Sequence, residues 1–195
     1  VLEALAGNLC RCTGYRPIID AGCAMRTYPE PARWSREAAQ AAAHAELLQS
    51  IQRDRMLALP GFVAPRTVDE LAEALEAAPD SLLLAGGTDI GLWVTKHLRK
   101  LPPIVYLGEV AELQAIEIGD NHLRIGAAVA LTDAWREIVA RIPALAEVAE
   151  RFGSPPVRNS GTLGGNVANG SPIGDSMPLL IALGASVVLM STRGH

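Results

Sequence analysis

From residue 61 onward, short apolar runs alternate with segments whose hydrophobic residues recur at a helical period. Apolar runs of this length predict buried strands, and the periodic segments predict amphipathic helices. The predicted strands span 81–85, 104–107, 113–118, 122–127 and 185–190. The predicted helices span 67–78, 90–98, 132–140, 143–152 and 176–183. Strands and helices mixed in this way predict an α+β fold.

Polar residues at two predicted helix starts support these assignments. Thr67 and Glu70 match a capping box, and Thr132 stands where it can cap the helix that runs to Ala140. Residues 153–174 differ, because they are rich in Gly, Ser, Pro and Asn and follow no regular pattern. They predict an irregular segment, and one of this length is uncommon in a compact domain unless it has a function.

The amino-terminal part of the chain is organised differently. Two short predicted helices, 1–6 and 17–28, flank a loop with two cysteines, and an Ala-rich segment with helical content follows. Pro60-Gly61 ends that segment at a shift in composition. The expected division is a first domain over residues 1–29, a linker over 30–60 and a second domain over 61–195.

Composition narrows the function classes. The 195 residues carry a formal charge of -4 and have lysine only at Lys96 and Lys100, so the chain lacks the basic surface of a nucleic-acid-binding protein. Its longest apolar stretch, 177–190, is broken by Pro178 and is too short to span a membrane. An odd number of cysteines favours a reducing compartment. We therefore expect a cytoplasmic location, with no nucleic-acid or membrane partner.

A first glycine-rich motif spans residues 84–91, where a predicted strand leads through Gly86 and Gly87 into a helix. Glycines let the backbone approach a ligand closely, and free amides before a helix favour phosphate. The spacing differs from a dinucleotide-binding fingerprint, and no Lys-Ser/Thr pair follows as in a Walker loop. A tight structural turn is the alternative.

A second motif lies in the irregular segment and runs from Arg158 to Asp175. It offers Thr162 and Asn166 as hydrogen-bonding side chains, amides that we expect to be unencumbered, and Asp175 as an acceptor for ribose or ribityl hydroxyls. Two such segments in one domain favour a large phosphorylated ligand. A flexible surface loop is the alternative, against which the apolar residues within the segment argue.

The loop between the first two predicted helices carries Cys10 and Cys12. Two thiolates one residue apart can bind adjacent irons or one shared iron, with Arg11 and Arg16 offsetting their charge. A Cys-x-Cys pair alone is a weak metal signal, and ordinary buried thiols are the alternative. Cys23 lies a helical run away and is expected to pack as a helix residue.

Residues 7–17, 83–91 and 162–175, in this order, resemble the molybdenum hydroxylase family, and within it most closely the small FAD and iron-sulfur subunit of xanthine dehydrogenases. The resemblance implies the end of an all-helical 2Fe-2S domain, then an FAD-binding α+β domain of the p-cresol methylhydroxylase type, incomplete at its carboxyl end. It implies Cys10 and Cys12 as cluster ligands. The implied FAD contacts are Leu83, Leu84, Ala85, Gly86, Gly87, Thr88, Asp89, Ile90, Phe152, Thr162, Gly165, Asn166 and Asp175.

The function that the resemblance implies is electron transfer. A large subunit with the molybdenum cofactor would oxidise hypoxanthine and xanthine to urate, in a heterotetramer of two small and two large subunits. Electrons would pass through 2Fe-2S clusters to FAD and then to NAD. Because cofactors carry this chemistry, no side chain is expected to act as an acid or base.

Two alternatives stay open. A related enzyme could oxidise an aldehyde, an aromatic acyl-CoA or an N-heterocycle, because the molybdenum subunit sets the substrate. The other alternative is a noncatalytic nucleotide-binding module. The cysteine motif and the FAD region on one chain favour xanthine dehydrogenase, since enzymes of the carbon monoxide dehydrogenase type carry them on separate chains.

Overall fold

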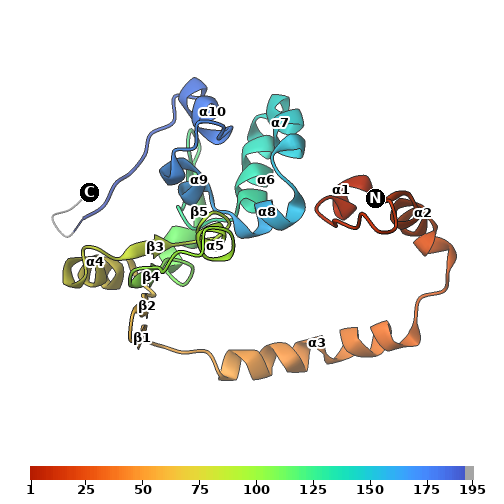
Figure 1. The fold of residues 1–195 in the computed structure, drawn as a ribbon, viewed down its shortest axis with the longest axis horizontal. Coiled ribbons are helices and arrows are strands. Elements are labelled where there is room, and N and C mark those ends of the chain that lie inside the picture. Colours follow the sequence, from red (N-terminus) through yellow and green to blue (C-terminus); the bar gives the residue numbers. More distant parts are fainter. Residues whose placement is uncertain (192–195) are drawn as a thin grey trace. The chain divides into compact units, whose positions relative to one another are not determined.

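The computed structural model describes residues 1–191 and separates into two compact units, one ending at Asp54 and one beginning at Arg55 (Figure 1). The helices of the first unit are α1 (Leu2–Leu5), α2 (Arg16–Ala24), the 3-10 helix η1 (Met25–Thr27) and α3 (Ala32–Ser50). Helices α1 and α2 pack together at Gly22, where a Cβ atom would lie 3.0 Å from the Val1 side chain. Neither helix buries a residue completely. A small helix–helix contact thus holds the cysteine loop.

The second unit mixes strands and helices, which confirms the predicted α+β fold. Its strands are β1 (Leu57–Leu59), β2 (Phe62–Ala64), β3 (Leu82–Leu84), β4 (Ile104–Tyr106), β5 (Ile116–Ile118) and β6 (Leu123–Ile125). Its helices are α4 (Val68–Ala77), α5 (Ile90–Thr95), α6 (Leu131–Arg141), α7 (Ala146–Arg151), α8 (Pro155–Ser160), α9 (Leu163–Asn169) and α10 (Ser176–Ala182), with 3-10 helices η2 (Ala111–Gln114) and η3 (Pro143–Leu145). Strand β1 lies in the range that composition assigned to the linker.

A four-stranded sheet of order β1-β2-β4-β3 frames the first glycine motif. Strands β2 and β3 run parallel to β4, whereas β1 pairs with β2 in the antiparallel sense. Helix α4 lies beside this sheet, and its Leu71 forms a buried cluster with Val105 and Val110 (Figure 1). The chain leaves the carboxyl end of β3 and enters α5 through the turn at Gly86 and Gly87. The sheet therefore holds the start of this turn in a fixed place.

A second buried cluster joins α6 to the end of α7. Leu131, Trp135 and Ile138 on α6 pack with Phe152, which directly follows α7. The rings of Trp135 and Phe152 are tilted, with their centroids 5.1 Å apart. Strand β6 and helices α9 and α10 also pack against this cluster. Aromatic side chains bury large apolar areas, so this cluster anchors the helical part of the unit.

One of the two predicted helix caps is confirmed. The Thr67 hydroxyl accepts a hydrogen bond from the Glu70 N–H at 3.2 Å, and the Glu70 carboxylate reaches back to the Arg66 N–H at 2.7 Å. The predicted cap by Thr132 is wrong. Helix α6 begins one residue earlier, and the Thr132 hydroxyl donates to Asn159 Oδ1 at 2.6 Å. Thr132 therefore links α6 to α8.

The prediction of an irregular segment over 153–174 is also wrong, because α8 and α9 lie within it. Pro155 stands in the first turn of α8, where a missing N–H costs nothing, and Thr162 caps α9. The predicted strand over 185–190 is absent from the described residues. Val187, Val188 and Leu189 are exposed there, and no ladder partner pairs with them within residues 1–191.

No helix among the described residues combines the length and the apolar character that a membrane span would require.

Candidate functional site

The turn between β3 and α5 has unpaired backbone donors. Gly87 takes a positive φ of 71°, which glycine adopts without strain. Within residues 1–191, the N–H groups from Gly86 through Ile90 donate to no protein acceptor. The next amide, that of Gly91, donates to the Gly87 carbonyl at 2.8 Å. Thr88 and Asp89 are exposed, and Gly86, Gly87 and Ile90 are half-buried. Such a row of amides suits an anion.

The same turn packs directly against the end of α8. A Cβ atom on Gly86 would overlap the carbonyl oxygen of Ser160 and would lie 2.7 Å from its carbonyl carbon. The position of a Cβ atom on Gly161 is 3.6 Å from Thr88 Oγ1. The structure therefore brings the two glycine-rich motifs together, as a ligand contacting both would require.

Over residues 163–166, however, the amides of the second motif are already occupied. Thr162 is buried, and its segment runs antiparallel to Ala130 through an isolated bridge. The donors and acceptors are Leu163 N–H to Val129 O at 3.0 Å, Gly164 N–H to Ala127 O at 3.0 Å, Gly165 N–H to Thr162 Oγ1 at 3.1 Å, and Asn166 N–H to Thr162 O at 2.9 Å. The expectation of unencumbered amides over 163–166 is wrong, because they complete the protein's own hydrogen bonding.

Close packing explains a glycine in this second segment. A Cβ atom on Gly164 would lie 2.5 Å from the Cβ atom of Ala127 and 2.7 Å from its carbonyl oxygen. Real Cβ atoms do not approach backbone so closely, so Gly164 allows two backbone segments to touch. This glycine thus helps to form what we call the supporting wall of the site, the packed segment 162–166.

Asn166 and Asp175 meet at the start of α10. Asn166 Oδ1 accepts a hydrogen bond from the hydroxyl of Ser176, a residue that is 1% exposed. Asp175 precedes that serine and is exposed, with no side-chain cap bond to α10. The Asn166 side chain therefore joins α9 to α10, while the Asp175 carboxylate stays open to solvent.

The apolar candidates divide between core and surface. Phe152 is 8% exposed and belongs to the Trp135 cluster, whereas Leu83 is 45% exposed on β3. Leu84 and Ala85 are half-buried as they lead into the turn. Of these residues, Leu83 to Ala85 adjoin the open amides in sequence, and Phe152 is packed inside the helical core.

The cysteine loop lies in the first unit. Cys10 is half-buried and Cys12 is exposed. The Thr13 hydroxyl donates to Cys10 Sγ at 3.1 Å, and this hydrogen bond lowers the pKa of the Cys10 thiol. Cys23 is exposed on α2, so its prediction as a packed residue is wrong. The described residues hold no group of three candidate metal ligands, and Cys10 with Cys12 provides half of a four-thiolate set.

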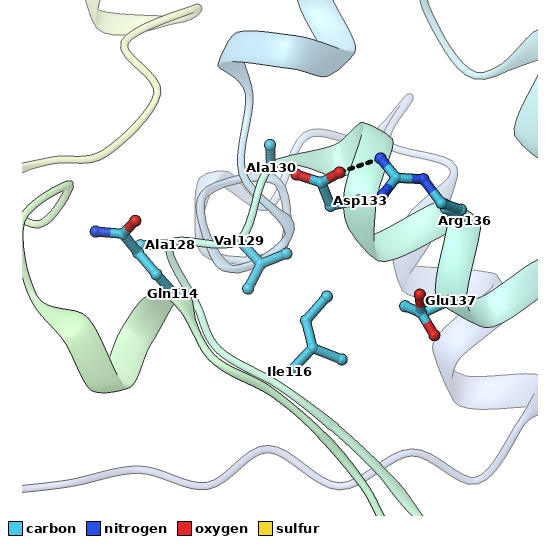
Figure 2. Close-up of a pocket in the computed structure, with 8 residues that line it drawn as sticks. All are labelled: Gln114, Ile116, Ala128, Val129, Ala130, Asp133, Arg136 and Glu137. Carbon is cyan, nitrogen blue, oxygen red and sulfur yellow. Dashed lines mark hydrogen bonds and ion pairs between the residues drawn. The ribbon is translucent and has the colours of Figure 1, made fainter. Parts of the chain in front are cut away.

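A hollow of about 310 Å³ lies on α6 and the adjoining chain (Figure 2). Ile116 and Val129 form apolar parts of its lining, and the carboxylate of Asp133 pairs with Arg136 at its edge. The Glu137 carboxylate pairs with Arg141 at 3.4 Å. None of the residues predicted to contact FAD lines this hollow, but Val129 and Ala130, which do, pair with the segment at Thr162.

Sequence reasoning missed three residues that shape the site: Arg158, Ser160 and Ser176. Ser160 acts through its carbonyl group, which no sequence pattern marks. Ser176 lies in a predicted helix, and a serine at the start of a helix is too common to indicate a buried contact. Arg158 was visible as the cation that opens the second motif, but burial was needed to distinguish it from a surface arginine.

Residues 55–195 match the family model described as the FAD binding domain in molybdopterin dehydrogenase. The chain is 34% identical to the nicotinate dehydrogenase FAD-subunit of Eubacterium barkeri, over 68% of this chain and 46% of that protein. It is 26% identical to xanthine dehydrogenase 2 of Arabidopsis thaliana, over 98% of this chain and 19% of that protein.

A similar solved structure is that of the carbon monoxide dehydrogenase from Hydrogenophaga pseudoflava that lacks the Mo-pyranopterin moiety of the molybdenum cofactor. The TM-score is 0.61 and the identity 33%, over 68% of this chain and 47% of that chain. The chain spans less than half the length of each of these three proteins.

Proposed function

Because the chain belongs to the family of FAD-binding domains of molybdopterin dehydrogenases, we propose that its turn from Gly86 to Ile90 holds the diphosphate of FAD. The observation that carries this proposal is the row of successive amides without a protein acceptor. The residues present fit the group, since glycine backbone can approach phosphate oxygens closely and the amides donate to them. The Ser160 carbonyl group packs directly against Gly86 of this turn.

The other candidate contacts surround that turn in distinct roles. Asp89 and Asp175 are carboxylates, so we assign them to hydroxyls of the ligand rather than to its phosphates. Thr162, Gly165 and Asn166 form the supporting wall, in which the amides of Gly165 and Asn166 donate to Thr162. We assign Leu83, Leu84 and Ala85 to apolar faces of the nucleotide, and Phe152, which is 8% exposed in the Trp135 cluster, to the core that supports the site.

When bound, FAD supplies electron acceptance and onward delivery of a hydride, which are properties of the cofactor. The chain's own part is to bind and orient. The open amides place the diphosphate, and β3 holds the turn on the sheet. No acid or base from this chain is required for that task.

The proposal for the whole protein is the electron-transfer subunit of a xanthine dehydrogenase, with NAD as acceptor and a molybdenum-cofactor subunit as partner. In it, residues 1–29 end a helical 2Fe-2S domain in which Cys10 and Cys12 are cluster ligands, and 30–60 is a linker. The match to a xanthine dehydrogenase over 98% of this chain supports it, because that match extends into the cysteine segment.

A second candidate function is oxidation of an N-heterocycle such as nicotinate. It is favoured by 34% identity to a nicotinate dehydrogenase FAD-subunit. Turnover of xanthine against nicotinate by the whole complex distinguishes the two, since the partner subunit sets the substrate.

The binding proposal is tested on the full-length protein after removal of its flavin. Titrations with FAD and with riboflavin are followed by flavin fluorescence. FAD should bind more tightly by roughly a hundredfold, because only FAD carries the diphosphate and charge-assisted hydrogen bonds are the strong ones. Equal affinity for the two flavins, or no binding of FAD, would contradict the proposal.

The cysteine assignment has a separate test in the native complex. C10S and C12S should each remove one iron-sulfur signal from the electron paramagnetic resonance spectrum, because each variant loses a thiolate ligand. Both variants should keep the flavin bands of the absorption spectrum. C23S is the matched control and should keep every signal. Full cluster signals in C10S and C12S would show that other residues bind the iron.

A further inference from the structure

Arg158 is a buried arginine that lies between the parts of the candidate site. Arg158 is 8% exposed. Its guanidinium donates to the carbonyl oxygens of Ala149 at 3.1 Å, Glu150 at 3.2 Å and Gly153 at 3.4 Å. Carbonyls at the end of a helix lack partners within that helix, so Arg158 satisfies the end of α7 and the turn after Phe152.

Helix α8, which carries Arg158, depends on such anchors. It has six residues, and a helix of that length is not stable by itself. Asn159 of α8 also bonds to another helix: its Oδ1 accepts from Thr132 of α6 at an exposed position. Hydrogen bonds from a charged donor at a buried position are stronger than neutral ones at the surface. Arg158 is therefore the main polar attachment of α8 to α7.

The placement of α8 sets the shape of the turn at Gly86. Ser160 is the last residue of α8, and its carbonyl group leaves no room for a side chain on Gly86. Gly161 follows and lies beside Thr88. A shift of α8 would thus move the surface against which the open amides are held.

We propose that Arg158 is a positioning residue for the FAD diphosphate, acting through α7, α8 and the Ser160 carbonyl. This inference rests on the function proposed above. Since Arg158 acts through these groups, its loss should weaken binding of FAD, which carries the diphosphate, more than binding of riboflavin, which does not.

The test compares R158M, R158K and R151M in the full-length protein. Arg151 ends α7, pairs with Glu147 at 2.9 Å and has a side chain 79% exposed, so R151M removes an exposed arginine from the same helix end. R158M should weaken FAD binding roughly tenfold and leave riboflavin binding within about twofold. R158K keeps the charge and should recover part of the loss, and R151M should match the wild type.

Thermal unfolding and hydrogen-deuterium exchange of the peptide over 82–95 complete the test without flavin. R158M should exchange faster than R151M in that peptide. Wild-type FAD affinity in folded R158M, equal losses for FAD and riboflavin, or unchanged exchange over 82–95 would overturn the proposal for Arg158. If R158M does not fold, R158K decides by the same readouts. Failure of the wild type to bind FAD would instead overturn the proposed function. The exchange data need no flavin and therefore still test whether Arg158 positions the turn.

Discussion

Two glycine-rich segments are similar in sequence but have different roles in the structure. Over 86–90 the backbone amides have no protein acceptor among the described residues, whereas over 163–166 each amide bonds within the protein. Gly86 and Gly164 each let two backbone segments touch, so the two segments differ in whether their amides have acceptors. Glycine content therefore marks a close approach without telling whether a ligand or the protein itself approaches.

The largest expected effect is that of G86A. A methyl group there would collide with the Ser160 carbonyl, which is backbone and cannot rotate away. We expect FAD affinity to fall about a hundredfold, because relieving such overlap costs a few kcal/mol and displaces the turn. Fluorescence titration of the deflavinated protein measures it. Affinity close to the wild type would show that the turn is not held against α8.

G164A should separate stability from binding. Its methyl group would lie 2.5 Å from the Ala127 Cβ atom, so we expect a loss of about 1–3 kcal/mol in the free energy of unfolding. FAD affinity measured where the variant is folded should change far less than in G86A, since the Gly164 amide already bonds to Ala127. Denaturant unfolding gives the first quantity. A drop in affinity without a loss of stability would place this segment in contact with FAD.

T162A is expected to have a smaller effect. The Thr162 hydroxyl accepts from the Gly165 N–H at 3.1 Å and caps α9, and loss of such a cap costs about 1 kcal/mol. T162S retains the hydroxyl and is the matched control. Thermal unfolding of the two variants checks the difference. Equal stability of T162A and the wild type would mean that the cap contributes nothing to the wall of the site.

What the sequence could predict depended on how local the cause was. The cap at Thr67 and the turn between β3 and α5 follow from neighbouring residues, and both were predicted. Helices α8 and α9 were not, because short helices rich in Gly and Pro depend on tertiary contacts such as those of Arg158. The strand expected over 185–190 had the right side chains, but a strand also needs a partner strand, which a local pattern does not reveal.

The open amides of 163–166 were predicted on the same local grounds and failed for a related reason. Leu163 and Gly164 donate to Val129 and Ala127, which are far away in sequence, and only Gly165 and Asn166 donate to the neighbouring Thr162. By contrast, the sequence predicted only that the two motifs bind one ligand, and it did not predict the contact between Gly86 and Ser160. Which carbonyl would meet which glycine required the three-dimensional path of the chain.

The smallest expected effect is that of G91A. This variant tests where the turn with open amides ends. Gly91 belongs to the same motif as Gly86, but a Cβ atom there meets nothing within 4 Å and its amide already bonds to Gly87. Alanine in α5 should raise the free energy of unfolding by about 0.5 kcal/mol and leave FAD affinity unchanged. Titration and thermal unfolding beside G86A check both. A clear loss of FAD affinity would mean that the ligand reaches the first turn of α5, so that the site extends past Ile90 along the helix.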